Sequence, residues 1–224
     1  MQDPYYFNRL YPLQDKALKI IDELASDFYL TGCTVLSRHY LHHRYSDDLD
    51  FFMNAQPDFH KQVDEIIATL NNSFNQSSAS LKEDTFVRLF ISEKDAVLKI
   101  YFINDVPFHC GELIASSLFS KTDSIQNILS NKISALSRDE SKDFADLLFI
   151  SRSFSFNWEQ AISEAKQKDT WVNELDISKR FHEFLVSRFE GLKWIENIDL
   201  KKCEQQLKQI AIDVLNGTDN SIFA

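Results

Sequence analysis

Residues 31–52 read TGCTVLSRHYLHHRYSDDLDFF. Gly32 separates a short apolar run at 29–32, which we expect to be a strand, from residues 33–41, whose spacing predicts a helix. After the polar residues 42–46, polar and apolar side chains alternate from 48 to 52, which predicts a second strand. Successive side chains of a strand point to opposite faces, so Asp48 and Asp50 are expected on one face, with Leu49 and Phe51 in the core.

Two carboxylates on one face repel each other unless a cation lies between them. Oxygen ligands of this kind suit Mg²⁺, which proteins usually hold with one or two carboxylates together with substrate phosphates. Gly32 ends one expected strand and opens a helix, so backbone N–H groups and the Thr34 hydroxyl could face an anion there. The pattern predicts a site that brings a triphosphate to a metal ion.

The charge around this segment favours a functional interpretation. A D-x-D pair alone is typical of solvated surface, and the chain is acidic, with 24 Lys and Arg against 34 Asp and Glu, a net charge of −10. Yet five basic or titratable residues precede the acidic pair: Arg38, His39, His42, His43 and Arg44. The overall charge argues against a broad nucleic-acid-coating surface but is compatible with a local pocket for a polyanionic substrate.

Glycine is scarce, and this excludes two common phosphate-binding motifs. Average usage of about 7% would give roughly sixteen glycines, whereas the chain has four, at 32, 111, 191 and 217. Neither G-x-G-x-x-G nor G-x-x-x-x-G-K-[ST] can be written with these positions. Any phosphate binding therefore depends on Gly32.

Outward from this segment, the periodicity divides the chain into two parts. Helices are expected at 13–28 and 57–70, a loop with room for a short strand at 71–80, and a hairpin of strands at 85–91 and 97–103. Beyond residue 120 the spacing is helical, at 122–138, 141–152, 157–168, 176–190 and 201–216. We therefore expect an α/β (α+β) core with a mixed sheet at residues 1–120 and a helical region at 121–224.

The apolar runs, the N-terminus and the cysteines together predict a cytoplasmic location. No apolar run approaches the ~18 residues of a membrane span, and the N-terminus lacks the apolar segment of a signal peptide. The three cysteines show no C-x-x-C pairing, which is typical of free thiols in a reducing compartment. We expect a cytoplasmic protein that does not bind membranes.

An ordered series of motifs resembles a known family. Gly32, Thr34 and the run HRYSDDLDF at 43–51 resemble the signature of the AbiEii/AbiGii-toxin-like nucleotidyltransferases, a branch of the polymerase-β-like superfamily. The segments VLKIYF (97–102), NKISAL (131–136) and KDFADL (142–147) resemble the family's later core strand, lysine helix and K/R-D-x-x-D-L helix. The resemblance covers roughly residues 15–152.

The resemblance implies a polymerase-β-like fold and transfer of a nucleoside monophosphate from an NTP to a hydroxyl acceptor, in RNA (particularly a tRNA end) or protein. It implies Asp48 and Asp50 as catalytic ligands of Mg²⁺ or Mn²⁺. Lys132 would face the triphosphate and Asp143 would act as base or metal ligand, while Asp146 anchors its helix. Nucleotide-binding positions by the same resemblance are Gly32, Thr34, Arg44, Ser46 and Lys132. The family also implies a toxin role with an antitoxin partner.

Two departures and one further pattern keep alternatives open. Cys33 follows Gly32 where relatives commonly have Gly or Ser, and Lys99 and Tyr101 stand where related enzymes often carry a third carboxylate. Either Asp143 supplies the missing function, or the protein is a catalytically weak nucleotide-binding or protein-interaction module. Separately, the spacing of His39, His42 and His43 would allow a zinc site on a helix.

Overall fold

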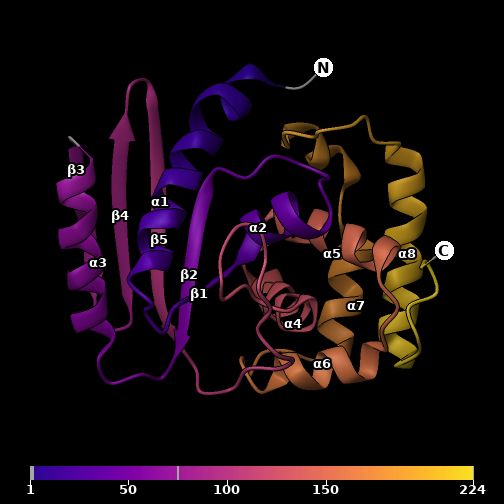
Figure 1. Ribbon diagram of the computed structural model, residues 1–224. Helices are drawn as coiled ribbons and strands as arrows, with labels where there is room; N and C mark the ends of the chain where they lie inside the picture. Colours follow the sequence, from indigo (N-terminus) through magenta and orange to yellow (C-terminus); the bar gives the residue numbers. More distant parts are fainter. Residues whose placement is uncertain (1–2, 75, 224) are drawn as a thin grey trace. The chain divides into compact units, whose positions relative to one another are not determined.

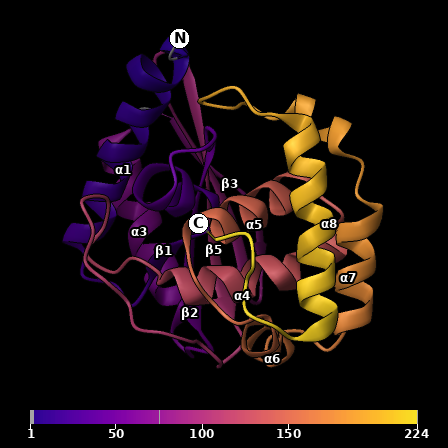
Figure 2. The same cartoon turned by 90° about the vertical axis from the view of Figure 1, so that its right-hand side faces the viewer.

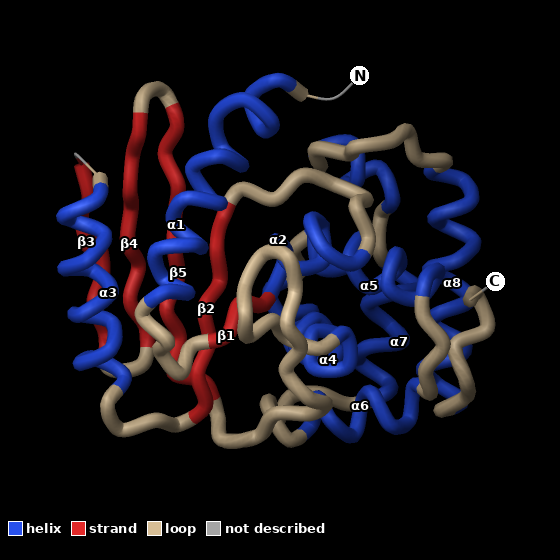
Figure 3. Tube along the Cα trace, viewed as in Figure 1, coloured by secondary structure: helices blue, strands red, loops and turns tan. Residues whose placement is uncertain are grey.

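A computed structural model describes residues 3–74 and 76–223, and the chain divides into two compact units, Met1–Ser124 and Ile125–Ala224 (Figure 1). All the strands of the described residues belong to the first unit, and the second is built of helices and loops (Figure 3). The fold is therefore mixed α/β with a helical C-terminal region, which confirms the predicted fold class.

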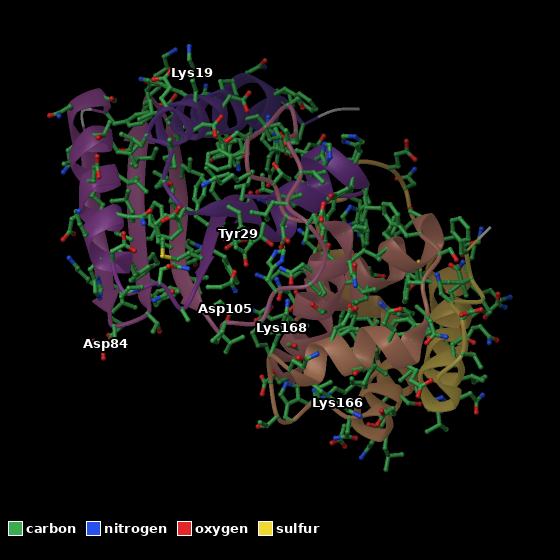
Figure 4. All side chains as sticks on the ribbon, turned by 60° about the horizontal axis from the view of Figure 1, so that its bottom comes forward. Lys19, Tyr29, Asp84, Asp105, Lys166 and Lys168 are labelled. Carbon is green, nitrogen blue, oxygen red and sulfur yellow. The ribbon has the colours of Figure 1, made fainter. Side chains whose placement is uncertain are left out.

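The first unit contains a five-stranded mixed sheet in the order β1-β2-β5-β4-β3. β2 and β5 are parallel, and the other neighbours are antiparallel. The strands are β1 (Tyr29–Thr31), β2 (Asp48–Asn54), β3 (Gln76–Glu83), β4 (Phe86–Glu93) and β5 (Ala96–Asp105). Asp84, in the β3–β4 turn, and Asp105, the last residue of β5, lie at the same end of the strands (Figure 4).

One face of the sheet is buried, and the other, which we call the open face, carries Asp48 and Asp50. Burial alternates along β2, where Leu49 and Phe51 are fully buried while Asp48 and Asp50 keep partial exposure. The Phe51 ring stacks on Phe102 of β5 at 5.5 Å. Two helices lie along this apolar side, α1 (Tyr11–Glu23) and α3 (Phe59–Ser73) (Figures 1 and 2). The predicted alternation is confirmed, and it leaves both aspartates away from the core.

The predicted helices of this unit are present with shifted ends. The first helix ends at Glu23 rather than at residue 28, and a π-helical turn, Tyr6–Leu10, precedes it. The helix expected at 33–41 consists of α2 (Gly32–Val35) and a π-helical turn, Leu36–Tyr40. Thr31 has an extended backbone and Gly32 a positive φ of 72°, so the chain turns sharply from β1 into α2.

The serine-rich stretch 71–80 holds more regular structure than its composition predicts. The helix α3 continues to Ser73, and β3 starts at Gln76 and pairs antiparallel with β4 through Glu83. Residue 75 lies outside the described residues. β3 is an edge strand, so it gains its backbone hydrogen bonds from β4 alone, and an edge strand tolerates a polar sequence that shows no apolar alternation.

The second unit contains five α-helices among its described residues, at the predicted places: α4 (Ile125–Ala135), α5 (Ser141–Ser153), α6 (Trp158–Lys166), α7 (Glu174–Glu183) and α8 (Leu200–Asn216). The helix expected at 176–190 ends at Glu183, because Phe184 adopts an extended backbone, and a 3₁₀ turn follows. Helices α7 and α8 pack side by side (Figure 2). None of the described helices combines the length and apolar character needed to cross a bilayer.

Candidate active site

Asp48 and Asp50 lie on the open face of the sheet, each opposite a residue of the parallel strand β5. Asp48 pairs in register with Lys99 and Asp50 with Tyr101, and on the other side Thr31 of β1 pairs with Asp50. Both carboxylates are partly exposed. Two carboxylates on one open face fit the oxygen donors that Mg²⁺ or Mn²⁺ takes from a protein when substrate phosphates complete its coordination.

The Gly32 backbone runs directly against one of these carboxylates. A Cβ placed on Gly32 would lie 2.4 Å from Asp50 Oδ2, closer than real Cβ contacts come, and its φ of +72° is strained for any L side chain. Only glycine therefore permits both the turn and the close approach. The sequence singled out this position, and the structure supplies the physical reason.

Thr34 and Ser46 connect the start of α2 to the start of β2. Thr34 is fully buried; its hydroxyl donates to the backbone carbonyl of Asp48 and lies 2.9 Å from Ser46 Oγ. Because a hydroxyl donates one hydrogen, Ser46 is the donor to Thr34 in this pair. Both hydroxyls are thus engaged within the protein, where they fix the backbone position of Asp48.

Arg44 lies in the segment that leads to β2 and is only 6% exposed. Its Nη1 donates to the carbonyl of Tyr45, and its own carbonyl accepts from Ser37 Oγ at 2.5 Å. The neighbouring Tyr45 ring stacks on Tyr6 at 4.2 Å, and the Tyr6 hydroxyl donates to Asp47. Burial, with the Asp47 carboxylate, raises the pKa of Tyr6 above its ordinary value, so the phenol stays protonated and keeps this bond.

Lys99 contacts the first aspartate. Its Nζ lies 3.3 Å from Asp48 Oδ1 and 3.4 Å from Oδ2. Partial burial by itself would lower the pKa of Lys99, but the Asp48 carboxylate and the Tyr101 hydroxyl outweigh it, so the pKa is raised. The ammonium therefore keeps its charge beside Asp48.

The second unit brings Lys132, Asp143 and Asp146 together. Lys132 Nζ lies 2.8 Å from Asp143 Oδ1 and 2.7 Å from Asp146 Oδ2, and both aspartates are fully buried. Arg138 Nη2 lies 2.9 Å from Asp143 Oδ2. Lys132 thus bridges the two carboxylates, and Arg138 places a second cation beside Asp143. Asp146, expected to anchor its helix, bonds to the same ammonium as Asp143, so these two side chains act as one ionic cluster.

His109 and Asp123 form a histidine–carboxylate pair that the sequence analysis did not single out. His109 Nε2 lies 3.1 Å from Oδ1 of the fully buried Asp123, and the Thr31 hydroxyl donates to Asp123 Oδ2 at 2.5 Å. The His109 ring also packs edge-on against Tyr29, which is labelled in Figure 4. No sequence signal links positions 109 and 123, because their contact depends on how the chain turns between them and not on a local periodicity.

The alternative zinc site has no support in the part of the chain that the structure describes. Within residues 3–74 and 76–223, no three His, Cys, Asp or Glu side chains are grouped so that they could hold a metal ion. His43 is buried, whereas His42 is exposed and has a positive φ of 51°. The helical turn ends at Tyr40, so His42 and His43 lie beyond it and do not share a helix face with His39.

Comparison with known proteins agrees with this fold. Two crystal structures from Helicobacter pylori are similar: one described as a "putative nucleotidyltransferase" (TM-score 0.62, 19% identity, covering 92% of this chain and 94% of that one) and that of JHP933 (TM-score 0.60, 19% identity, 92% and 90%). No curated protein matches the sequence. The family model described as nucleotidyl transferase AbiEii toxin, type IV TA system, matches residues 16–209. The chain therefore belongs to the AbiEii family of nucleotidyltransferase toxins, as its motifs predicted.

Proposed function

We propose that the protein transfers a nucleoside monophosphate from an NTP to a hydroxyl acceptor in a metal-dependent reaction. The acceptor oxygen forms a bond to the α-phosphorus, the bond from that phosphorus to the bridging β-oxygen breaks, pyrophosphate leaves, and the hydroxyl proton passes to a base. The observation that carries the proposal is the placement of Asp48 and Asp50 on the open face of the sheet, with Gly32 against Asp50.

Asp48 and Asp50 would hold the metal ion, Mg²⁺ or Mn²⁺. When bound, such an ion neutralises charge on the phosphates and favours ionisation of the attacking hydroxyl. The chain's own contribution is to hold these carboxylates in place, and the Thr34 and Ser46 hydroxyls support this through the Asp48 carbonyl. Reaction rates depend steeply on such positioning.

Phosphate binding is proposed at the turn around Gly32. A residue without a side chain lets a phosphate approach the backbone beside Asp50. Three of the proposed nucleotide-binding residues are buried: Thr34, Arg44 and Ser46. We therefore propose that Thr34 and Ser46 mainly support this turn and that Arg44 supplies positive charge for the phosphates. Lys132 is the proposed cation for the triphosphate and Asp143 the proposed base or metal ligand, both on the ground of family membership.

The acceptor is proposed to be a hydroxyl of RNA, such as a tRNA end, or of a protein. Membership in a type IV toxin–antitoxin family supports a toxin role countered by an antitoxin protein, and a cytoplasmic location fits this role.

Labelled-nucleotide transfer tests the proposal. The protein is incubated with each α-³²P-labelled NTP, Mg²⁺ or Mn²⁺, and total RNA or total protein. Transfer by the wild type should fall at least ~100-fold in Asp48→Asn and Asp50→Asn, because charge stabilisation at the phosphates is lost. Asp84→Asn, in the β3–β4 turn, is the matched control and should behave as wild type. Equal transfer by Asp48→Asn and the wild type would contradict the proposal.

A second candidate is a catalytically weak nucleotide-binding or protein-interaction module. Lys99 and Tyr101 favour it, because they lie opposite the aspartates where a further carboxylate would assist chemistry. Nucleotide-dependent thermal stabilisation without label transfer to any acceptor would select this alternative.

A further inference from the structure

The segment between β5 and α4, residues 106–124, is a long loop that folds back on itself. Its two ends meet where His109 Nε2 lies 3.1 Å from Asp123 Oδ1. Its returning part pairs with β1, because the Leu30 amide donates to the Lys121 carbonyl and the Leu30 carbonyl accepts from the Asp123 amide, both at 2.9 Å. Long loops whose ends lie together are frequently functional. This loop is therefore a candidate for binding a substrate beside β1.

A cavity of about 330 Å³ lies where the loop meets the sheet. Its lining includes Tyr29, Asn54, Gln56, His109 and Leu113. The volume is at the lower end of the ~300–1,000 Å³ typical of small-molecule sites. Of the described residues that line it, none is Lys or Arg, so the cavity favours an uncharged group over a phosphate.

His109 presents a hydrogen-bond acceptor in a fixed direction. Asp123 is fully buried, and its other carboxylate oxygen accepts from the Thr31 hydroxyl at 2.5 Å. Because a carboxylate accepts, His109 Nε2 carries the hydrogen of their contact, and in the neutral imidazole Nδ1 is then an acceptor. The Tyr29 ring packs edge-on against the imidazole at 5.1 Å, which fixes the plane of the ring.

Two amides of the same cavity also keep acceptors for a ligand. Asn54 Nδ2 donates to the Val106 carbonyl at 2.8 Å, and Gln56 Nε2 donates to the Asn54 carbonyl at 3.2 Å. Since a carbonyl only accepts, the nitrogen of each amide faces the protein, and each amide oxygen is left for a ligand. Asp27 belongs to the rim, because its side chain is 61% exposed and accepts from Gln62 at 2.8 Å.

The cavity lies along the strands that carry the proposed phosphate site. Tyr29 is in register with Phe52, as Thr31 is with Asp50, so these side chains share one face of the sheet. Tyr29 precedes Gly32 by a strand length of about 10 Å. In an NTP the ribose separates the phosphates from the base, so phosphates bound at Gly32 leave the base free to enter the cavity.

Resting on the proposed function, we propose that this cavity binds the base of the NTP and selects bases that carry an exocyclic amino group, namely adenine, cytosine or guanine, over uracil. The amino group donates to His109 Nδ1 and to the amide oxygens. Uracil has a carbonyl oxygen where cytosine has its amino group, and this oxygen would face those acceptors without a hydrogen between them. His109 is thus a specificity-determining residue, and Asp123 fixes its tautomer.

Matched pairs of nucleotides isolate the amino group. CTP has an amino group where UTP has a carbonyl oxygen, and ATP has an amino group that purine riboside triphosphate lacks. The α,β-methylene forms are titrated with Mg²⁺ into the full chain by calorimetry. In the pair that binds more tightly, the amino-bearing member should bind at least ~fivefold tighter than its partner, because the partner leaves acceptors of the cavity unpaired. A smaller difference or a reversed preference would overturn the inference.

Two variants tie the preference to this cavity. His109→Phe keeps a ring against Tyr29 but removes the acceptor, and it should reduce the preference at least ~twofold. Gln56→Met changes an exposed side chain, leaves the His109–Asp123 contact intact and should also reduce the preference. Asn72→Met, at an exposed amide of α3, is the matched control and should keep the wild-type preference.

Thermal unfolding establishes which variants are folded, and Gln56→Met alone decides if His109→Phe is not. An unchanged preference in the folded variants would overturn the inference. If NTP pairs bind alike while transfer depends on the terminal base of an RNA acceptor, the cavity serves the acceptor and the placement of the NTP base is wrong. Label transfer that does not depend on Asp48 would instead contradict the proposed function itself, so the two failures are distinguishable.

Discussion

Gly32 Cα lies so close to Asp50 that a methyl group on it would meet Asp50 Oδ2 at 2.4 Å, and the Asp50 Cγ at 3.1 Å. The two residues belong to neighbouring elements, the turn into α2 and the strand β2, which approach only because position 32 has no side chain. Any side chain at position 32 would therefore displace the Asp50 carboxylate.

Gly32→Ala should therefore damage the site more than the fold. The added Cβ must displace the Asp50 carboxylate, and the positive φ adds strain of about 1–2 kcal/mol. We expect Mn²⁺ and NTP binding to weaken at least ~10-fold in titration calorimetry. Gly191→Ala is the matched control, because nothing lies within 4 Å of its Cβ position and its φ is not positive. Wild-type NTP affinity in Gly32→Ala would rule out this placement of the site.

Thr34→Val removes the hydroxyl that holds the Asp48 carbonyl while keeping the side-chain shape. The partly buried Asp48 carbonyl and the Ser46 hydroxyl lose a partner, which should lower the free energy of unfolding by about 1–3 kcal/mol in urea denaturation. Transfer should fall through displacement of Asp48. Thr34→Ser, which keeps the hydroxyl, should recover much of both. A stable Thr34→Val with normal turnover would show that this hydroxyl does not position Asp48.

Lys132→Met should destabilise the helical unit, whatever its effect on catalysis. It removes the ammonium that lies 2.8 Å from Asp143 Oδ1 and 2.7 Å from Asp146 Oδ2, both of them fully buried, and breaking a buried ion pair costs about 3–5 kcal/mol. Adding Asp146→Asn removes one excess charge and should restore part of the stability. Transfer measured in this double variant then reports the role of Lys132 in chemistry. If Lys132→Met unfolds at the wild-type temperature, the cluster is not a stabilising one.

Asp123→Ala tests the histidine–carboxylate pair. Loss of the carboxylate leaves the buried Thr31 hydroxyl and His109 Nε2 without this acceptor, which should cost about 1–3 kcal/mol. Thr31 pairs with Asp50, so transfer should also fall. Asp27→Ala, at an exposed residue just before β1, serves as the control and should be close to wild type. Unchanged stability in Asp123→Ala would argue against the pairing.

The sequence by itself determined the elements and the face on which the aspartates lie. The alternation around Leu49 and Phe51 placed Asp48 and Asp50 opposite the core, because the two-residue period of a strand is a local property of the backbone. The same reasoning located the five helices of the second unit. It allowed only a short strand within 71–80, whereas β3 runs from Gln76 to Glu83, because β4 supplies the hydrogen bonds that hold these polar residues in a strand.

Tertiary structure decided which residues meet. Lys99 is 51 residues from Asp48 in sequence, and only the register of the parallel strands β2 and β5 places its ammonium on that carboxylate. Likewise, Lys132 meets Asp143 and Asp146 only because α4 packs against α5. His109 and Thr31 both contact Asp123 only because the segment after β5 folds back beside β1. Contacts of this kind depend on strand register and packing between distant segments, which local periodicity does not encode.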